Sequence, residues 1–268
     1  MQACNDHYFR HIGEMMSMED LLRRISRCSN IDTCIDGNNE DHPCSRIILS
    51  QGASKLADFY APEPWSGRIE TAPILFIGDN TRMIADEEYP TLAWPDYLIK
   101  DFFNDRFGGG RKKWIKDGLY PLCSDGTHKK QWNRLWSACA NRTHELFESF
   151  SINPGHDFAV SETVRCRTFK QLNISKAVHE CCSQYLKQVI EISGALIVVG
   201  MGPNAKHYIH QAYDINTEKL TCGPIHLGGR ERYFAFLPHY NRRGPRSFGE
   251  SFNRDELNLL VNHLKNTK

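Results

Sequence analysis

The sequence lacks any long hydrophobic run. Its apolar runs, such as residues 195–199, are far shorter than the roughly 20 residues that a membrane-spanning helix needs. The start of the chain, from Met1 to Glu14, is polar and has no apolar stretch of the kind found in secretory signals. We therefore expect a cytoplasmic protein that does not enter a membrane.

An excess of charge of one sign is also absent. The 33 basic and 32 acidic residues leave a net charge of +1, so the protein as a whole does not attract nucleic acid. Any contact with DNA has to come from local basic clusters. Internal repeats and long low-complexity tracts are lacking, and a composition of 40% hydrophobic and 24% charged residues is typical of a globular protein. The length of 268 residues favours one domain over residues 1–268.

What the chain does have is a set of short apolar runs rich in Ile, Val and Phe, separated by stretches of helical character. The runs are 74–77, 158–164, 195–199 and 233–237, and the helical stretches are 131–150, 175–192 and one beginning near 204. This alternation is typical of α/β proteins. It predicts a three-layer α/β/α sandwich with a mostly parallel central sheet.

The remaining segments are harder to assign. We expect a helix at 18–25, a polar loop at 36–43 and a short strand at 46–49. Prolines and a glycine-rich basic run interrupt residues 89–118, which we interpret as a weakly ordered insertion.

Ten cysteines are a high number for this length. A reducing compartment argues against disulfides, so metal ligation is the leading use for several of them. Four have no partner at a ligand-like spacing and are expected to be small buried residues: Cys4, Cys123, Cys139 and Cys222. The others are candidate ligands: Cys28, Cys34, Cys44, Cys166, Cys181 and Cys182.

Polar side chains come at or near the ends of three of the predicted strands. Asp79 and Asn80 follow the first, Glu162 lies near the end of the second, and His239 follows the last. Ligands of open α/β sheets bind at the carboxyl ends of the strands, so these residues would share one crevice. Each alone has an ordinary structural explanation, as a helix cap, an arginine partner or a loop histidine.

In several motifs the chain resembles the family 4 uracil-DNA glycosylases. Residues 158–167, 182–186 and 197–200 correspond in order and spacing to the family motifs TN-x-V-K-C-R-P, C-R-P-Y-L and I-V-x-L-G. Residues 76–80 stand in place of the family's G-E-A-P-G, and Pro238-His239 in place of its H-P-S or H-P-A. The resemblance covers about residues 20 to 250 and implies a uracil-DNA glycosylase-like fold, with DNA as the partner of a monomer.

The resemblance also implies a four-iron, four-sulfur cluster. Cys166 and Cys182 match two of the family's cluster ligands, and the other two come from the cysteine-bearing segment 20–50, where Cys28, Cys34 and Cys44 compete for two places. Zinc is the alternative metal, because four thiolates also form a closed tetrahedral site.

The family's mechanism implies roles for the crevice residues. Glycosylases flip a nucleotide out of the duplex, and water attacks the sugar as the base departs. By motif position Asp79 or Asn80 would orient the water and His239 would bond the base oxygen, with Asn80 and His239 as the leading pair. Tyr120 would stack on the base.

The run Asn241, Arg242 and Arg243 falls in the loop that enters the minor groove in this family. A departure from the family pattern bears on the substrate, because Glu162 replaces the asparagine that reads uracil. An ionised carboxylate only accepts hydrogen bonds, which suits the amino group of cytosine and disfavours uracil O4.

We therefore expect the target to be a modified cytosine, such as hydroxymethylated or glucosylated cytosine in phage DNA, and the role to be anti-phage defence. A protonated Glu162 would allow uracil excision in base excision repair. A catalytically silent iron–sulfur DNA-binding protein is the alternative outside enzymes.

Overall fold

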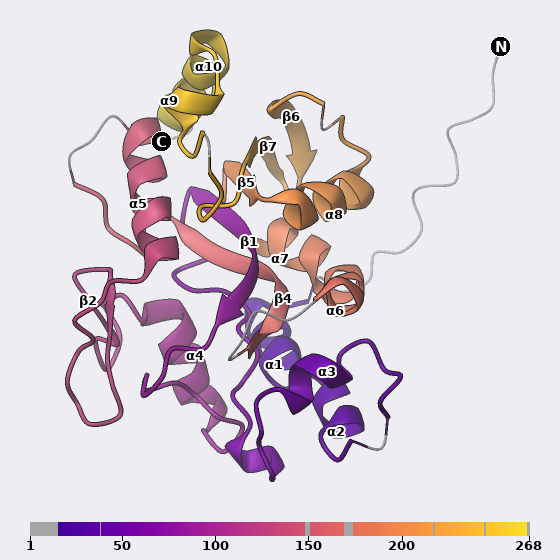
Figure 1. The fold of residues 1–268 in the computed structure, drawn as a ribbon. Helices are drawn as coiled ribbons and strands as arrows, with labels where there is room; N and C mark the ends of the chain where they lie inside the picture. Colours follow the sequence, from indigo (N-terminus) through magenta and orange to yellow (C-terminus); the bar gives the residue numbers. More distant parts are fainter. Residues whose placement is uncertain are drawn as a thin grey trace, which may run out of the picture.

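The centre of the molecule is a five-stranded sheet. A computed structural model describes residues 16–37, 39–147, 151–168, 174–216, 218–243 and 245–266. The strand order is β4-β1-β5-β7-β6, in which β6 alone runs antiparallel to its neighbour (Figure 1). The strands are β1 (Ile74–Arg82), β4 (Ala159–Thr168), β5 (Ile197–Met201), β6 (Thr221–Leu227) and β7 (Arg230–Leu237). The predicted α/β class and mostly parallel sheet are confirmed.

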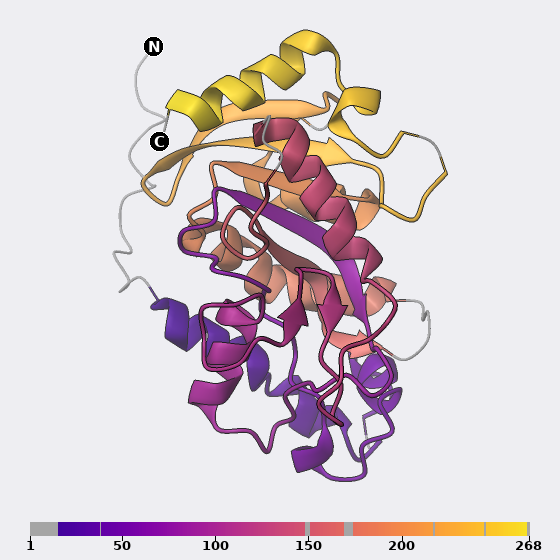
Figure 2. The same ribbon diagram turned by 90° about the vertical axis from the view of Figure 1, so that its left-hand side faces the viewer.

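Helices cover both faces of the sheet. Figure 1 shows α5 on one side and α6, α7 and α8 on the other, and Figure 2 shows α5 running across its face of the sheet. These helices are α5 (Arg134–Phe147), α6 (Ser175–Cys181), α7 (Lys187–Ile192) and α8 (Pro203–Tyr213), with a π-helical turn, η2 (Cys182–Leu186), joining α6 to α7. Within the described ranges no helix is both long and apolar enough to cross a membrane.

Shorter elements surround this core. They are α1 (Met18–Ser26), α2 (Asn30–Cys34), α3 (Ser45–Leu49), η1 (Leu56–Asp58), α4 (Asp96–Asp105), α9 (Phe248–Ser251), α10 (Arg254–Asn266) and a separate hairpin of β2 (Ile115–Lys116) and β3 (Tyr120–Pro121). The predicted helix at 18–25 is confirmed as α1.

Two predicted segments are wrong. Residues 46–49 belong to helix α3, in which the adjacent Ile47 and Ile48 are both buried, and a short apolar run does not by itself distinguish a helix from a strand. The segment 89–118 is not weakly ordered throughout, because it contains α4, which buries Phe102 and Phe103. Pro95 caps the start of this helix and does not interrupt it.

The burial of the strands explains which of them were recognisable. All ten residues of β4 are buried, as expected for a parallel strand covered on both faces. The missed strand, β6, lies at the edge, is partly exposed and contains Gly223 and Pro224. Such residues occur on edge strands and weaken the strand signal in a sequence.

The strands of the sheet end at different levels. Pairing of β1 with β5 ends at Ile77 and Gly200, whereas pairing of β1 with β4 continues to Arg82 and Thr168. The chain also passes from β4, on one side of β1, to β5 on the other, so the end of β1 is the point where the strand order reverses. Ligand sites of open α/β sheets form at such switch points.

A buried network of charges anchors the segment after β1 to the sheet. Arg106 bonds Glu87 at 2.9 Å and Glu63 at 3.4 Å, and Arg167 of β4 bonds Glu87 at 2.7 Å. The Tyr89 hydroxyl donates to Glu63 at 3.2 Å. Because each acid has a basic partner and all five side chains are buried, the network holds the segment in place.

We expect Arg106→Met to destabilise the protein by about 3–5 kcal/mol, because it leaves the buried Glu63 without its basic partner and removes one of the two partners of Glu87. The free energy of unfolding from urea titration measures this effect. Lys112→Met is the matched control, since Lys112 bonds Glu88 at the surface and its loss should cost less than about 1 kcal/mol. Equal effects of the two substitutions would contradict the role of the network.

Candidate functional site

Asp79 lies in the part of β1 that extends past β5, and it faces the segments that follow β5 and β7. A Cβ placed on Gly202 would lie 3.4 Å from both Asp79 Oδ2 and His239 Cβ, which shows how closely the three residues approach. Gly202 has a φ of +99°, a conformation that favours glycine. The Asn204 side chain, in the first turn of α8, forms a hydrogen bond with Asp79.

One oxygen of Asp79 remains available. Asp79 Oδ1 is buried and has no hydrogen-bond partner within the described part of the chain. Buried polar atoms are nearly always satisfied, so an unpartnered carboxylate oxygen at a switch point indicates a place for water or ligand. Burial raises the pKa of Asp79, while the nearby His239 and the bond to Asn204 act in the opposite direction.

His239 is arranged to donate from Nε2. Burial lowers its pKa, as does Arg142, although Asp79 opposes them, so the imidazole is neutral at neutral pH. The backbone N–H of Asn241 donates to His239 Nδ1 at 3.3 Å. Since Nδ1 accepts this bond, the single proton of the neutral ring lies on Nε2.

Asn80 has a different role from the one predicted. Its Nδ2 donates to the carbonyl oxygens of Cys166, at 2.7 Å, and Val164, at 3.3 Å, and its Oδ1 accepts from Thr168 at 2.9 Å. These bonds span the register shift in the β1–β4 pairing, between Asn80 and Arg82. The Asn80 amide is thus used in joining the strands, and Asp79 replaces Asn80 as the leading partner of His239.

Glu162 lies over β1. It is 2% exposed and stands opposite Gly78 in the strand pairing. A Cβ on Gly78 would be 2.4 Å from Glu162 Oε2, so the absence of a side chain at Gly78 makes room for the carboxyl group. Burial, followed by the charge of Glu162, raises the pKa of Tyr240 to about 12, which places that ring near Glu162.

Tyr240 is the aromatic residue that the structure brings to the site. Its ring centroid lies 4.3 Å from that of His239, with 36° between the planes. Tyr120, predicted to stack on the base, lies instead in the separate β2–β3 hairpin opposite Lys116. Sequence reasoning missed Tyr240 and Asn204, although each lies shortly after a recognised strand.

The loop after β7 carries the predicted DNA-binding residues. Asn241, Arg242 and Arg243 are exposed. Arg142 of α5 holds the loop, because its Nε donates to the Arg246 carbonyl at 2.8 Å and its Nη2 to the Pro238 carbonyl at 3.2 Å. The same guanidinium therefore fixes the chain on both sides of His239.

Four cysteines from distant parts of the chain come together beside the end of β4. They are Cys28 after α1, Cys44 before α3, Cys166 in β4 and Cys181 at the end of α6. The thiols of Cys44 and Cys181 share a hydrogen bond, which lowers the pKa of Cys181 and raises that of Cys44. Cys28 and Cys166 are near enough to act electrostatically on the other two.

The structure places the adjacent candidates Cys181 and Cys182 differently. Cys182 points elsewhere, with its thiol donating to the Thr163 carbonyl at 3.6 Å, and Cys181 lies among the other cysteines in its place. Successive residues of a helix face different directions, so only one of this pair can join the group. Among the N-terminal candidates, Cys28 and Cys44 both lie near Cys181, whereas Cys34 is near Cys166.

All of the cysteines in the described ranges are free thiols. Over the same ranges no three His, Cys, Asp or Glu side chains are grouped so that they could hold a metal ion.

Neither the models of known protein families nor the curated proteins give a match to this sequence. The chemistry of the site therefore has to be inferred from its own residues.

We expect Asp79→Asn to stabilise the protein at neutral pH. The pKa of Asp79 in the folded protein lies above its ordinary value of 3.8, so the folded state favours the protonated acid and loses stability as pH rises through the raised pKa. The substitution should raise Tm at pH 7.5 by on the order of 1–3 °C, and the gain should shrink towards pH 4. Thermal unfolding at several pH values measures it.

Asp125→Asn is the control, because the pKa of Asp125 is lowered whereas that of Asp79 is raised. Hydrogen bonds from Thr127 lower the pKa of the exposed Asp125, so this substitution should not raise Tm at pH 7.5. A lower Tm for Asp79→Asn than for the unaltered protein at pH 7.5 would show that the ionised Asp79 does not destabilise the folded state.

Proposed function

We propose that this protein is a cytoplasmic DNA glycosylase that hydrolyses the N-glycosidic bond of a base flipped out of DNA. The base is a modified cytosine, such as a hydroxymethylated or glucosylated cytosine of phage DNA, and the biological role is anti-phage defence. The observation that carries the proposal is the pairing of Asp79, with its buried unpartnered Oδ1, and a neutral His239 at the switch point of the sheet.

Asp79 is suited to activate the attacking water, and His239 is suited to stabilise the departing base. The bond between C1′ and the base nitrogen breaks, and its electron pair leaves with the base while positive charge develops on the sugar. Asp79 Oδ1 accepts a hydrogen bond from the attacking water and takes its proton as the new C1′–O bond forms. His239 Nε2–H donates to the oxygen of the departing base anion, which takes up a proton from solvent and is released, while Asp79 returns its proton to solvent.

Glu162 and Tyr240 support recognition of the base. The Glu162 carboxylate, placed against Gly78, is an acceptor suited to the exocyclic amino group of cytosine. The ring of Tyr240 offers a face on which a flipped base can stack. Ordinary cytosine is abundant in any host genome, so a useful enzyme with this preference has to select a modified cytosine.

The proximity of four cysteines is the observation that favours a structural cluster, although in the described ranges their side chains are not grouped as metal ligands. Four cysteine thiolates are the ligand set of a four-iron, four-sulfur cluster, and Cys28, Cys44, Cys166 and Cys181 would hold it. Such a cluster would tie α1–α3 to β4 and α6 and would contribute no step to base excision. Zinc is the alternative metal for the same thiolates.

The proposed activity is tested with two sets of oligonucleotides, one containing uracil and the other cytosine, hydroxymethylcytosine or glucosylated hydroxymethylcytosine. We expect alkali-sensitive sites only in the modified-cytosine substrates. His239→Ala should lower kcat by roughly 10²–10³, because it removes a donor to the departing base. His226→Ala, an exposed position on β6, is the matched control and should leave kcat unchanged.

Glu162→Asn should shift activity from modified cytosine towards uracil, because the amide can donate to O4. Excision of uracil alone by the unaltered protein would identify a uracil-DNA glycosylase and reject the proposed substrate. DNA binding without excision of any base would favour a catalytically silent binding protein.

Adjacent cysteines provide a test of the cluster. We expect Cys181→Ser to lower the iron and sulfide content of the purified protein and its visible absorbance by at least about half, and Cys182→Ser to leave them unchanged, since four thiolates hold the cluster. The reverse result would restore Cys182 as the ligand. Zinc in place of iron and sulfide in the unaltered protein would reject the iron–sulfur proposal.

A further inference from the structure

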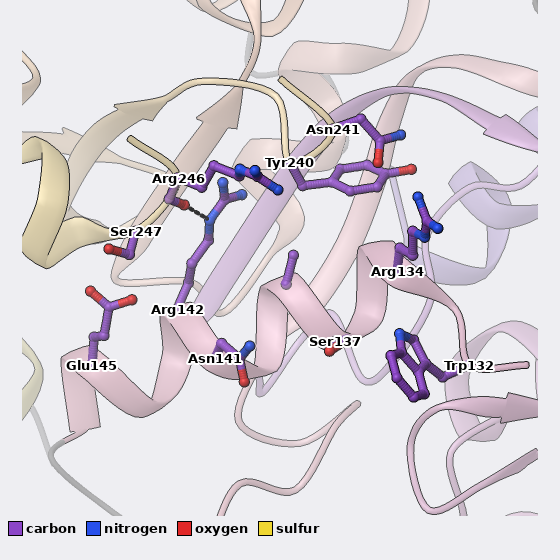
Figure 3. Close-up of a pocket in the computed structure, with 11 residues that line it drawn as sticks. Trp132, Arg134, Ser137, Asn141, Arg142, Glu145, Tyr240, Asn241, Arg246 and Ser247 are labelled. Atoms are coloured by element: carbon purple, nitrogen blue, oxygen red, sulfur yellow. Dashed lines mark hydrogen bonds between the residues drawn. The ribbon is translucent and has the colours of Figure 1, made fainter. Parts of the chain in front are cut away.

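We infer that a groove along α5 binds single-stranded DNA next to the flipped nucleotide. This inference rests on the proposed function, because it assigns the strand form of the same substrate. The groove has a volume of about 420 Å³ and lies between α5 and residues that follow β7, among them Tyr240 and Arg246 (Figure 3). Residues that line it include Trp132, Arg134, Asn141, Tyr240, Asn241 and Arg246.

The groove adjoins the candidate site through Tyr240. Tyr240 and Asn241 line it, and Tyr240 is also the ring that contacts His239 and lies near Glu162. Figure 3 shows Tyr240 and Asn241 above α5, on the same side as Arg134. A strand with one nucleotide in the site would therefore have its next nucleotides over α5.

Trp132 provides a surface for stacking. It is 58% exposed, whereas Trp65, Trp114 and Trp136 are buried and Trp94 is partly buried. Tryptophan is enriched at binding interfaces, because its ring offers a large apolar face together with one hydrogen-bond donor. Bases stack on such rings in proteins that bind single strands, whereas the faces of bases within a duplex are already covered.

Arginines on both walls provide the charge for a DNA backbone. Arg134 comes from α5 and Arg246 from the opposite segment, both are exposed, and neither forms an ion pair in the part of the chain that the structure describes. The one acid that lines the groove, Glu145, accepts hydrogen bonds from the backbone of Phe248 and Gly249 at the start of α9. An exposed ring at one end of the groove and exposed arginines on both walls match the unpaired bases and phosphates of a single strand (Figure 3).

The test uses the full chain with an unmodified, fluorescein-labelled oligonucleotide of about 15 nucleotides, as a single strand and as a duplex. Fluorescence anisotropy gives Kd at several salt concentrations. We expect Trp132→Ala to weaken binding of the single strand about tenfold and to change binding of the duplex less than about twofold. Tyr97→Ala, at an equally exposed aromatic residue on α4, is the control and should change neither.

The double substitution of Arg134 and Arg246 by Ala should reduce the slope of log K against log salt by about 1.4 for the single strand, because two phosphate contacts are lost. Arg230→Ala, at the opposite end of β7, should leave the slope unchanged. A purely structural effect of the arginines would lower affinity without changing the slope.

Equal loss of single-strand and duplex binding in Trp132→Ala would overturn the inference. An effect confined to glucosylated oligonucleotides would also overturn it, because the groove would then hold the base substituent. These binding measurements do not depend on excision. Trp132-dependent binding of the single strand by a protein that excises no base would therefore contradict the proposed glycosylase activity and leave the proposed groove standing. If Trp132→Ala left excision unchanged on both single-stranded and duplex DNA, the proposed groove would be contradicted and the glycosylase activity would stand.

Discussion

β1 stays paired with β4 as far as Arg82 and Thr168, although its pairing with β5 ends at Ile77. The residues of β1 beyond Ile77 therefore have a strand on one side and loops on the other. Asp79 lies in this stretch, which is why its carboxyl group meets Gly202, Asn204 and His239 from the segments after β5 and β7. The arrangement of the candidate site follows from this difference in strand length.

Two sets of buried polar contacts keep this geometry in place. The extension of β1 beyond β5 is held against β4 by the Asn80 amide at the bulge, and Arg167 of β4 bonds Glu87 in the charge network after β1. The loop after β7 is held by Arg142 of α5, which bonds carbonyl oxygens on both sides of His239. Loops that position reacting groups need such anchors, because their own backbone bonds are few.

The helix α5 connects the candidate site with its surroundings. Its Arg142 fixes the His239 loop, its Glu145 binds the start of α9, and its outer surface forms one wall of the groove that contains Trp132. One helix thus contacts both the candidate site and the groove proposed to bind the DNA strand. The grouped cysteines lie elsewhere in the fold, where Cys166 of β4 approaches the N-terminal segment that contains Cys28 and Cys44.

The sequence by itself determined the α/β class, the four parallel strands and the main helices. Buried parallel strands are continuous apolar runs, which can be recognised directly in the sequence. The sequence also predicted Asp79, Glu162 and His239 at or near strand ends, whereas in the structure Asp79 and Glu162 lie within β1 and β4 and His239 follows β7. Only the tertiary structure decided that Asn80 joins two strands while Asp79 faces His239, since adjacent polar residues of a strand look alike in sequence. It also showed that Tyr240 contacts His239 and that Cys181, not the adjacent Cys182, lies beside Cys44. The side-chain direction at each position depends on register, bulges and helix phase, which contacts between distant segments set.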